Sequence, residues 1–156
     1  MFNKTKDIAL MLCNTLLILL WVYTAASKLM DIAEFKRQLY SQNFTRAFAH
    51  VLLWLIPSIE LIAAILLLYK NTRLVGLILS ILLMALFTGY IALVLFGYYD
   101  RVPCSCGGVL KSLGWHTHLW FNLFFLLISL LGSYLCSKER KQLNQNIHGI
   151  YSSGNR

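Results

Sequence analysis

The sequence predicts an all-α membrane protein: an up-down bundle of four transmembrane helices, with a short interfacial helix between the first two spans. Of its 156 residues, 58% are hydrophobic and only 13% are charged, and the mean hydropathy is +0.65. Ordinary soluble domains carry about 25% charged residues. The apolar residues gather in four runs, and each run is close to the roughly 20 residues that cross the hydrocarbon core of a bilayer.

The four predicted spans account for most of the chain. The first run follows Lys4, Lys6 and Asp7, a start that also fits a signal peptide with a small-residue cleavage site near Ala25; we expect an uncleaved first span. Only K-N-T-R, residues 70–73, separates the second and third runs, and so short a connection makes the two helices antiparallel neighbours. The expected spans are residues 8–27, 48–69, 74–97 and 119–136.

A short helix is predicted between the first two spans, over residues 31–42. Asp31 and Glu34 have the spacing of an N-terminal capping pair. One helical face is apolar, and the charged residues lie elsewhere. The apolar residues of that face are Ile32, Phe35 and Leu39. This pattern is typical of a helix lying in the membrane interface, and a surface helix that only connects two spans fits it equally well.

One membrane domain is expected over residues 1–136, followed by a polar tail over residues 137–156. The tail has no apolar periodicity, so we expect it to be cytoplasmic, solvated and partly disordered. The formal net charge is +8, yet the basic residues stand in short clusters between apolar runs. The lipid bilayer is therefore the expected partner of these charges, and nucleic acid is excluded.

The distribution of lysine and arginine predicts that both termini are cytoplasmic. With the N-terminus inside, the inward basic residues form a small majority and crowd close to span ends, and the first helix usually dominates the orientation. The two sets are Lys4, Lys6, Lys70, Arg73, Lys138, Arg140 and Lys141 inside, and Lys28, Lys36, Arg37, Arg46, Arg101 and Lys111 outside. In a bacterial inner membrane, the segment between the third and fourth spans then faces the periplasm.

Two cysteines one residue apart, Cys104 and Cys106, lie in that segment. A disulfide across a single residue closes a very small ring, and strain makes such a bond easier to reduce. It also stabilises little, because the effect of a disulfide grows with loop length. The pair therefore suits thiol–disulfide exchange better than stabilisation of the fold. The other cysteines, Cys13 and Cys136, lie near the opposite membrane face and are expected to be small apolar fillers.

The residues around the cysteine pair fit an accessible reactive site. Pro103 fixes the backbone before the first thiol, and Gly107 and Gly108 allow close approach of a partner's backbone. Nearby basic side chains favour the thiolate, which is the nucleophilic form. These side chains are Arg101, Lys111 and, when protonated, His116 and His118.

Two alternatives stand beside exchange. The cysteines could form an inert disulfide, either with each other or with a partner protein. A zinc site is the other alternative, because Cys104, Cys106, His116 and His118 supply a Cys2His2 set. Structural zinc sites usually separate paired ligands by two or more residues, so zinc ranks below exchange. Without a metal, the histidines are expected to be interfacial residues of an aromatic belt.

Glu60 lies about twelve residues into the second span, near the bilayer midplane, where an ionised carboxylate is costly unless it is paired, neutralised or hydrated. Asn14, Thr15 and Thr88 are expected at its level as hydrogen-bond partners. A proton-coupled site that accepts a quinone headgroup is one interpretation. A neutral carboxyl that fixes helix packing is the one we favour.

Three strings carry a resemblance to a known family. They are A-A-S-K-L-M-D-I-A-E-F closing the first span, P-S-I-E-L-I-A-A-I-L-L-L in the second, and P-C-S-C-G-G followed by W-H-T-H-L-W-F-N-L before the fourth. They resemble the DoxX-like family, and within it the MauE-type branch of methylamine-utilisation, redox-associated membrane proteins. The resemblance extends over nearly the whole chain up to Cys136. It implies a four-helix membrane protein that forms, reduces or transfers disulfides in envelope partners, together with a thioredoxin-like protein.

By position, the resemblance also assigns residues. Cys104 and Cys106 match the family's cysteine pair, Lys28 its lysine after the first helix and Glu60 its second-span glutamate. The chain has Cys-Ser-Cys-Gly-Gly where the branch commonly has Cys-Gly-Cys-Phe-Gly. The expected function is thiol–disulfide exchange at a periplasm-facing cysteine pair, without a bound cofactor. A non-catalytic assembly subunit of an envelope membrane complex is the alternative from another functional class.

Overall fold

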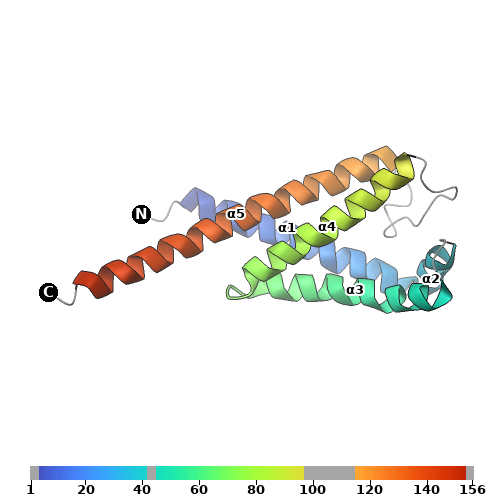
Figure 1. Ribbon diagram of the computed structural model, residues 1–156, viewed down its shortest axis with the longest axis horizontal. Coiled ribbons are helices and arrows are strands. Elements are labelled where there is room, and N and C mark those ends of the chain that lie inside the picture. Colours follow the sequence, from blue (N-terminus) through green and yellow to red (C-terminus); the bar gives the residue numbers. More distant parts are fainter. Residues whose placement is uncertain (1–3, 42–44, 97–114, 154–156) are drawn as a thin grey trace.

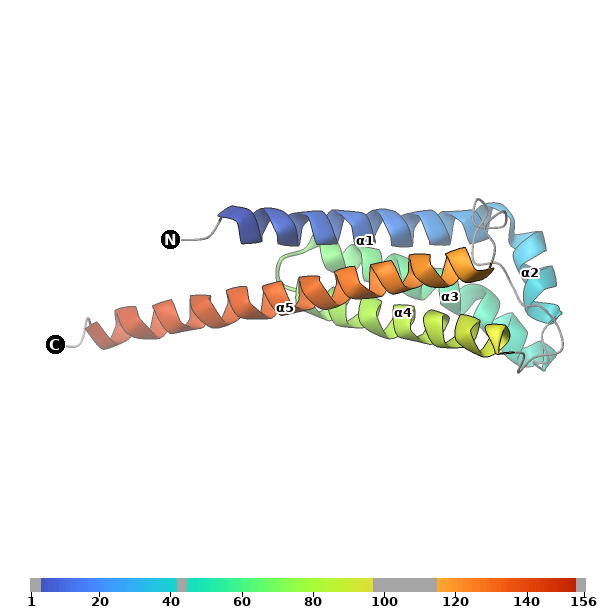
Figure 2. The same ribbon diagram turned by 90° about the horizontal axis from the view of Figure 1, so that it is seen from above.

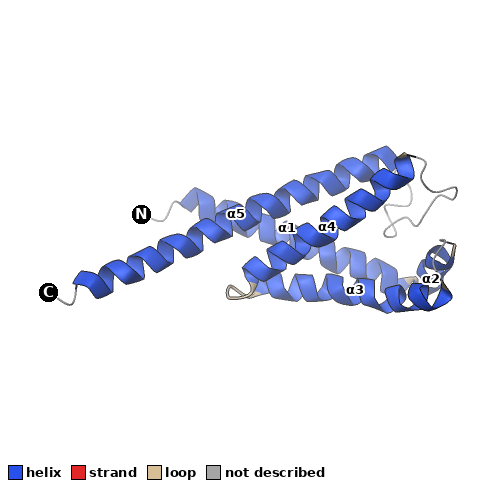
Figure 3. Ribbon diagram, in the orientation of Figure 1, coloured by secondary structure: helices blue, strands red, loops and turns tan. Residues whose placement is uncertain are grey.

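The computed structural model describes residues 4–41, 45–96 and 115–153, and every regular element in these ranges is an α-helix (Figure 3). Four of the helices are long and apolar enough to cross a membrane, which confirms the predicted all-α membrane class. α3 and α4 begin and end within two residues of the predicted spans, whereas α1 and α5 extend past theirs at both ends. The helices are α1 (Lys4–Met30), α2 (Ile32–Tyr40), α3 (Arg46–Leu68), α4 (Arg73–Leu95) and α5 (Trp115–Ser153).

The four long helices form an antiparallel bundle in which each packs on two neighbours (Figures 1 and 2). α1 and α4 each lie against both α3 and α5. Successive long helices run in opposite directions, so the bundle has up-down topology. One end of the bundle holds the end of α1, the whole of α2 and the start of α5, and we call it the α2 end. The opposite end, which holds the α3–α4 connection, is called the turn end.

Hydrogen bonds close the connection between α3 and α4. The backbone N–H of Thr72 donates to the carbonyl of Tyr69 at 3.2 Å, and the Thr72 hydroxyl donates to the carbonyl of Leu66 at 2.9 Å. From α5, the Arg140 guanidinium donates to the carbonyl of Asn71 at 2.5 Å. Carbonyls at the end of α3 that lack partners within the helix are satisfied in this way. The short connection places α3 and α4 side by side, as predicted.

The bundle core combines apolar packing with a buried polar contact. Leu17, Trp21 and Leu77 are fully buried. The Trp21 indole N–H donates to Ser80 Oγ at 2.9 Å, and the Ser80 hydroxyl donates to the carbonyl of Gly76 at 2.8 Å. A buried indole N–H and a buried hydroxyl both need partners. This chain of bonds ties α1 to α4, which face each other across the bundle.

The outward faces of the long helices expose large apolar side chains, including Leu19, Ile62, Leu86 and Leu127. In water, a continuous apolar surface of this kind would mark an interaction site or an aggregation hazard. Around a bundle of membrane spans, it is the surface that contacts lipid tails.

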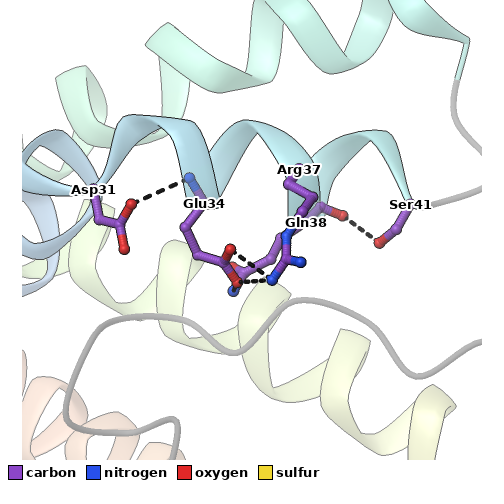
Figure 4. Close-up of polar contacts among 5 residues, drawn as sticks. All are labelled: Asp31, Glu34, Arg37, Gln38 and Ser41. Atoms are coloured by element: carbon purple, nitrogen blue, oxygen red, sulfur yellow. Dashed lines mark hydrogen bonds and ion pairs between the residues drawn. The ribbon is translucent and has the colours of Figure 1, made fainter.

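The predicted short helix is present as α2, and its first turn is capped as the sequence indicates (Figure 4). The Asp31 side chain accepts a hydrogen bond from the backbone N–H of Glu34 at 3.2 Å. The Glu34 carboxylate in turn accepts hydrogen bonds from Arg37 and Gln38. The hydrogen bond from Arg37 to Glu34, and then the charge of Glu34, raise the pKa of the Arg37 guanidinium.

The apolar face of α2 packs on the start of α3. Phe35 and Leu39 are buried against Ala49 and Leu53, and Ile32 packs against this small core. The predicted apolar face is therefore confirmed. α2 is thus attached to the bundle through this face.

α5 continues far beyond the other helices at the turn end (Figures 1 and 2). It is 39 residues long and ends at Ser153, so the expectation that residues 137–156 are partly disordered is wrong as far as Ser153. The reason lies in the composition, because Lys, Glu, Arg, Gln and Leu lose little rotamer freedom in a helix. After Ser137, neither Gly nor Pro interrupts the sequence before Gly149. The fourth span and the polar tail therefore form one continuous helix.

Replacing Gly76 by alanine should destabilise the bundle, because α3 and α4 touch there. A Cβ atom at Gly76 would lie 3.0 Å from the backbone N of Leu67 and 3.1 Å from the backbone C of Leu66. Backbone atoms cannot step aside without moving a helix, and overpacking of this kind costs about 1–3 kcal/mol. The measurement is the unfolding midpoint of the purified protein in detergent, followed by circular dichroism.

Gly89→Ala in the same helix is the matched control, because a Cβ atom there meets nothing within 4 Å. Its midpoint should stay unchanged or rise, since alanine has the higher helix propensity. Equal midpoints for the two variants would contradict the close approach of α3 and α4 at Gly76.

Candidate functional site

The cysteine motif lies outside the described residues. The motif and its neighbours comprise Pro103, Cys104, Cys106, Gly107 and Gly108. The flanking helices fix where the segment that contains them joins the bundle, because α4 ends at Leu95 and α5 begins at Trp115, both at the α2 end. The site that the described residues build lies inside the bundle at this same end.

Lys28 of α1 and Glu60 of α3 form a buried ion pair. Lys28 Nζ donates to Glu60 Oε1 at 2.7 Å and to the carbonyl of Thr24 at 3.2 Å. The two charged side chains are only 4% and 1% exposed. Taking charges out of water costs several kcal/mol per ion, and only close pairing with additional hydrogen bonds offsets that cost. The pair therefore holds α1 and α3 in one register.

The directions of the two helices bring these side chains together. In an α-helix, the Cα–Cβ bond tilts toward the N-terminus. α1 runs toward the α2 end and α3 runs away from it, so Lys28 reaches back into the bundle while Glu60 reaches toward the α2 end. The long aliphatic stem of lysine spans apolar surroundings and delivers its charge at the far end. A residue in the last turn of α1 thereby meets one near the middle of α3.

The hydrogen-bond partners expected for Glu60 were wrong. Thr15 is exposed, and its hydroxyl donates to a carbonyl of its own helix at 2.9 Å. The polar side-chain atoms of Asn14 and Thr88 have no hydrogen-bond partner among the described residues. Glu60 instead pairs with Lys28, so a charged pair takes the place of the expected neutral carboxyl. The expected partners were chosen by the depth of their Cα atoms in the membrane. That choice ignored the length of the lysine side chain, which reaches Glu60 from the end of α1.

A small cavity adjoins the ion pair and is lined by all four long helices. Its volume is about 20 Å³, which is room for roughly one water molecule. Pockets for small organic ligands are typically of roughly 300–1,000 Å³. A quinone headgroup at Glu60 therefore stays a prediction that requires the helices to separate. The lining residues are Thr24, Lys28, Glu60, His118 and Asn122, which are polar, and Leu20, Trp21, Met84, Phe87 and Phe121, which are not.

The two histidines at the start of α5 have different surroundings. His118 is 4% exposed and lines the cavity, whereas His116 is exposed. Residues two apart on a helix do not share a face, so the two imidazoles cannot bind one metal ion while this turn is helical. Within the described ranges, no three His, Cys, Asp or Glu side chains are grouped to hold a metal ion. The Cys2His2 site considered from the sequence also needs Cys104 and Cys106, which lie outside the described residues, so it stays a prediction.

Sequence reasoning missed two polar residues that line the cavity beside the ion pair, Thr24 and Asn122. Both are buried. Thr24 lies four residues before Lys28 on α1, and Asn122 lies four residues after His118 on α5. The sequence carried a sign of this, because polar residues four positions apart within an apolar run share one face of a helix.

Cys13 and Cys136 are free thiols, and both are buried. Cys13 packs close to α5, since a Cβ atom at Gly132 would lie 3.5 Å from Cys13 Cβ. A buried thiol does not need a hydrogen-bond partner, because it behaves as a small apolar group. Their predicted role as apolar fillers agrees with these positions.

Replacing Lys28 alone should cost far more stability than replacing both partners of the ion pair. Lys28→Met leaves the Glu60 carboxylate uncompensated, which should lower the free energy of unfolding by about 3–5 kcal/mol. Glu60→Gln should cost less, because the Lys28 ammonium keeps the carbonyl of Thr24 as an acceptor. The double variant should recover most of that loss. The measurement is a double-mutant cycle of unfolding by a denaturing detergent.

The exposed pair of α2 provides the control for this cycle. Glu34 and Arg37 are 2.7 Å apart, but the Arg37 side chain is 78% exposed, and exposed ion pairs contribute little. Arg37→Met and Glu34→Gln should therefore barely move the midpoint, singly or together. Additive losses at Lys28 and Glu60 would mean that the two charges do not depend on each other.

Comparison with known proteins gives one family match. No curated protein and no solved structure matches the chain. The family model described as "Methylamine utilisation protein MauE" matches residues 6–135, a stretch that contains Lys28, Glu60, His118 and both cysteines of the motif. The predicted resemblance to MauE-type proteins is thereby confirmed, and the wider DoxX-like grouping stays a prediction. Since the match covers most of the 156 residues, the chain belongs to the MauE family of methylamine utilisation proteins.

Proposed function

We propose that this MauE-family protein exchanges disulfides with an envelope partner through Cys104 and Cys106, in the bacterial inner membrane. The observation that carries the proposal is the pair itself, two cysteines one residue apart in a polar segment of an apolar chain. Support comes from the attachment of that segment to α4 and α5 at the α2 end. Two helices of a packed bundle thus hold its ends, and a reactive site works best on a rigid support.

The proposed reaction balances sulfur bonds, electrons and protons. The thiolate of one loop cysteine attacks a disulfide of the partner, so a mixed disulfide forms and the partner's second sulfur leaves as a thiolate. That sulfur takes up the proton that the attacking thiol lost. The other loop cysteine then attacks the mixed disulfide. Cys104 and Cys106 end as a disulfide, the partner ends as a dithiol, and a thioredoxin-like dithiol returns the pair to the reduced form.

The proposed topology places both termini in the cytoplasm and the cysteine segment in the periplasm. The sequence-based count assigned Lys28 to the outward side, but Lys28 is buried beside Glu60 and is not part of an exposed connection. Without it, the majority of basic residues at the turn end becomes larger. The positive-inside bias therefore favours a cytoplasmic turn end. The periplasm, at the α2 end, is a compartment in which disulfides form and persist.

Cys104→Ser and Cys106→Ser should each abolish turnover with a disulfide-containing partner while the protein still folds and inserts, because the reaction needs both an attacking and a resolving sulfur. Turnover is measured with purified protein and an oxidised partner. Cys106→Ser should also capture its partner as a mixed disulfide. The buried thiols provide the control, since Cys13→Ser and Cys136→Ser should both retain exchange.

The histidines separate exchange from the alternatives. His116→Ala and His118→Ala should slow exchange by only a modest factor, because an imidazole changes only the thiolate fraction. A zinc shell would lose its metal in either variant as readily as in Cys104→Ser. Stoichiometric zinc by elemental analysis, lost equally in these variants, would overturn the proposal. Full function without Cys104 and Cys106 would favour the non-catalytic assembly subunit.

An impermeant thiol reagent applied to the periplasmic side should label Cys104 and Cys106 after mild reduction. Cys13 and Cys136 should stay unlabelled from either side, because both are buried in the bundle. Mass spectrometry of the labelled protein in right-side-out and inverted vesicles gives the result. Labelling of Cys104 and Cys106 from the cytoplasmic side alone would reverse the topology.

A further inference from the structure

The cavity at the α2 end brings together three side chains that can carry a proton, each from a different helix. They are Lys28 of α1, Glu60 of α3 and His118 of α5, and all are at least nine-tenths buried. Ionisable residues inside a membrane protein are expensive, and proton relays and ion pathways are among the features that they mark. Apolar side chains of similar volume would pack the same space without that cost.

The contacts of Lys28 allow the charge of its partner to change. Its ammonium group is held by Glu60 Oε1 at 2.7 Å and also by the carbonyl of Thr24 at 3.2 Å. If the Glu60 carboxylate takes up a proton, Lys28 keeps a backbone acceptor. A lysine held by the carboxylate alone would be stranded by the same change.

No further charged side chain of the described ranges lines the cavity. α1 contributes Lys28 and α3 contributes Glu60; α4 contributes the apolar Met84 and Phe87. α5 contributes His118, with Asn122 one turn later on the same face. A buried water needs two to four polar partners, and these helices supply them around a space of about 20 Å³.

We propose that this cluster is a buried proton-binding site, in which a water molecule passes one proton from the His118 imidazole to the Glu60 carboxylate. His118 lies in the first turn of α5, at the α2 end, so the proton arrives there from the solution on that side. The imidazole gains a proton and gives it to the water, which gives one to Glu60. The imidazole ends neutral, Glu60 ends as a carboxyl, and Lys28 keeps its charge. Nothing is oxidised or reduced.

This site is separate from the thiol chemistry of the loop. It uses none of the four cysteines, and it explains why one of two neighbouring histidines faces the interior. Proton uptake should therefore be the same in Cys104→Ser as in the unaltered protein. The success or failure of this inference and that of disulfide exchange can thus be told apart.

Time-resolved infrared spectroscopy after a pH jump from about pH 8 to about pH 5, the range in which histidine ordinarily changes charge, tests the site. The probe is the carboxyl band of Glu60 in the full chain in lipid nanodiscs, assigned by its absence in the Lys28→Met/Glu60→Gln double variant. His118→Gln should slow the appearance of the band by at least about tenfold, since a positioned proton carrier accelerates transfer by factors of this order or more. His116→Gln, on the exposed side of the same turn, should leave the rate unchanged.

The final amplitude of the band shows whether a variant is folded, because the relay changes the rate and not the end point. Asn122→Leu removes a polar partner of the water and changes neither member of the ion pair, and it is a second variant that should slow the band. Two results would overturn the proposal. One is a Glu60 band that does not respond to pH in the unaltered protein. The other is a band that appears as fast in His118→Gln and Asn122→Leu as in His116→Gln.

Discussion

A lysine and a carboxylate enclosed by apolar side chains must stay together, because either charge left alone in such surroundings costs several kcal/mol. Lys28 and Glu60 are in this position, 2.7 Å apart and almost completely buried. α1 and α3 are therefore restricted to arrangements that keep the two in contact. α5 and α4 complete the surroundings of this pair, because His118 and Met84 line the cavity beside it. The α2 end of the bundle is thus organised around one electrostatic contact.

The rest of the bundle is held by contacts that work without water. Lipid tails are as apolar as leucine, so helices in a membrane gain little from apolar burial and associate through close packing and hydrogen bonds. Gly76 lets the backbones of α3 and α4 approach closely, and Gly132 leaves room on α5 for the side chains of Leu77 and Cys13. The hydrogen bond from Trp21 to Ser80 joins the helices that face each other across the core. These contacts are distributed along the spans, away from the charges.

The two ends of the protein differ in chemistry. The turn end carries basic residues, a hydrogen-bonded connection between α3 and α4, and the long extension of α5. The α2 end holds the ion pair and His118 inside the bundle, and its α4 and α5 hold the two ends of the segment with Cys104 and Cys106. The two proposals place thiol–disulfide exchange at the loop cysteines and, independently, proton transfer in the buried cluster. Membership of the MauE family supports a membrane role for the protein.

Local sequence determined the secondary structure of this protein. Apolar runs of the right length gave the spans, and Asp31 three residues before Glu34 gave the start of α2, because each depends on residues within a few turns of one another. The polar tail was wrongly expected to be partly disordered, but its helix also depends on local sequence, because the residues after Ser137 are good helix formers. The cysteine motif was found in the same local way, and its surroundings in space lie outside the described residues.

Tertiary structure alone decided which polar residues meet. Lys28 and Glu60 are 32 positions apart, and their contact depends on the antiparallel packing of two helices and on the reach of a flexible side chain. His116 and His118 look equivalent in the sequence, yet one is exposed and the other lines the cavity. The register and rotation of α5 make that difference, and packing against α1, α3 and α4 sets both. A sequence read along its length shows the charges that a membrane protein must bury, but their partners are fixed only when the helices pack, because in an apolar interior each charge is stable only beside its counterpart.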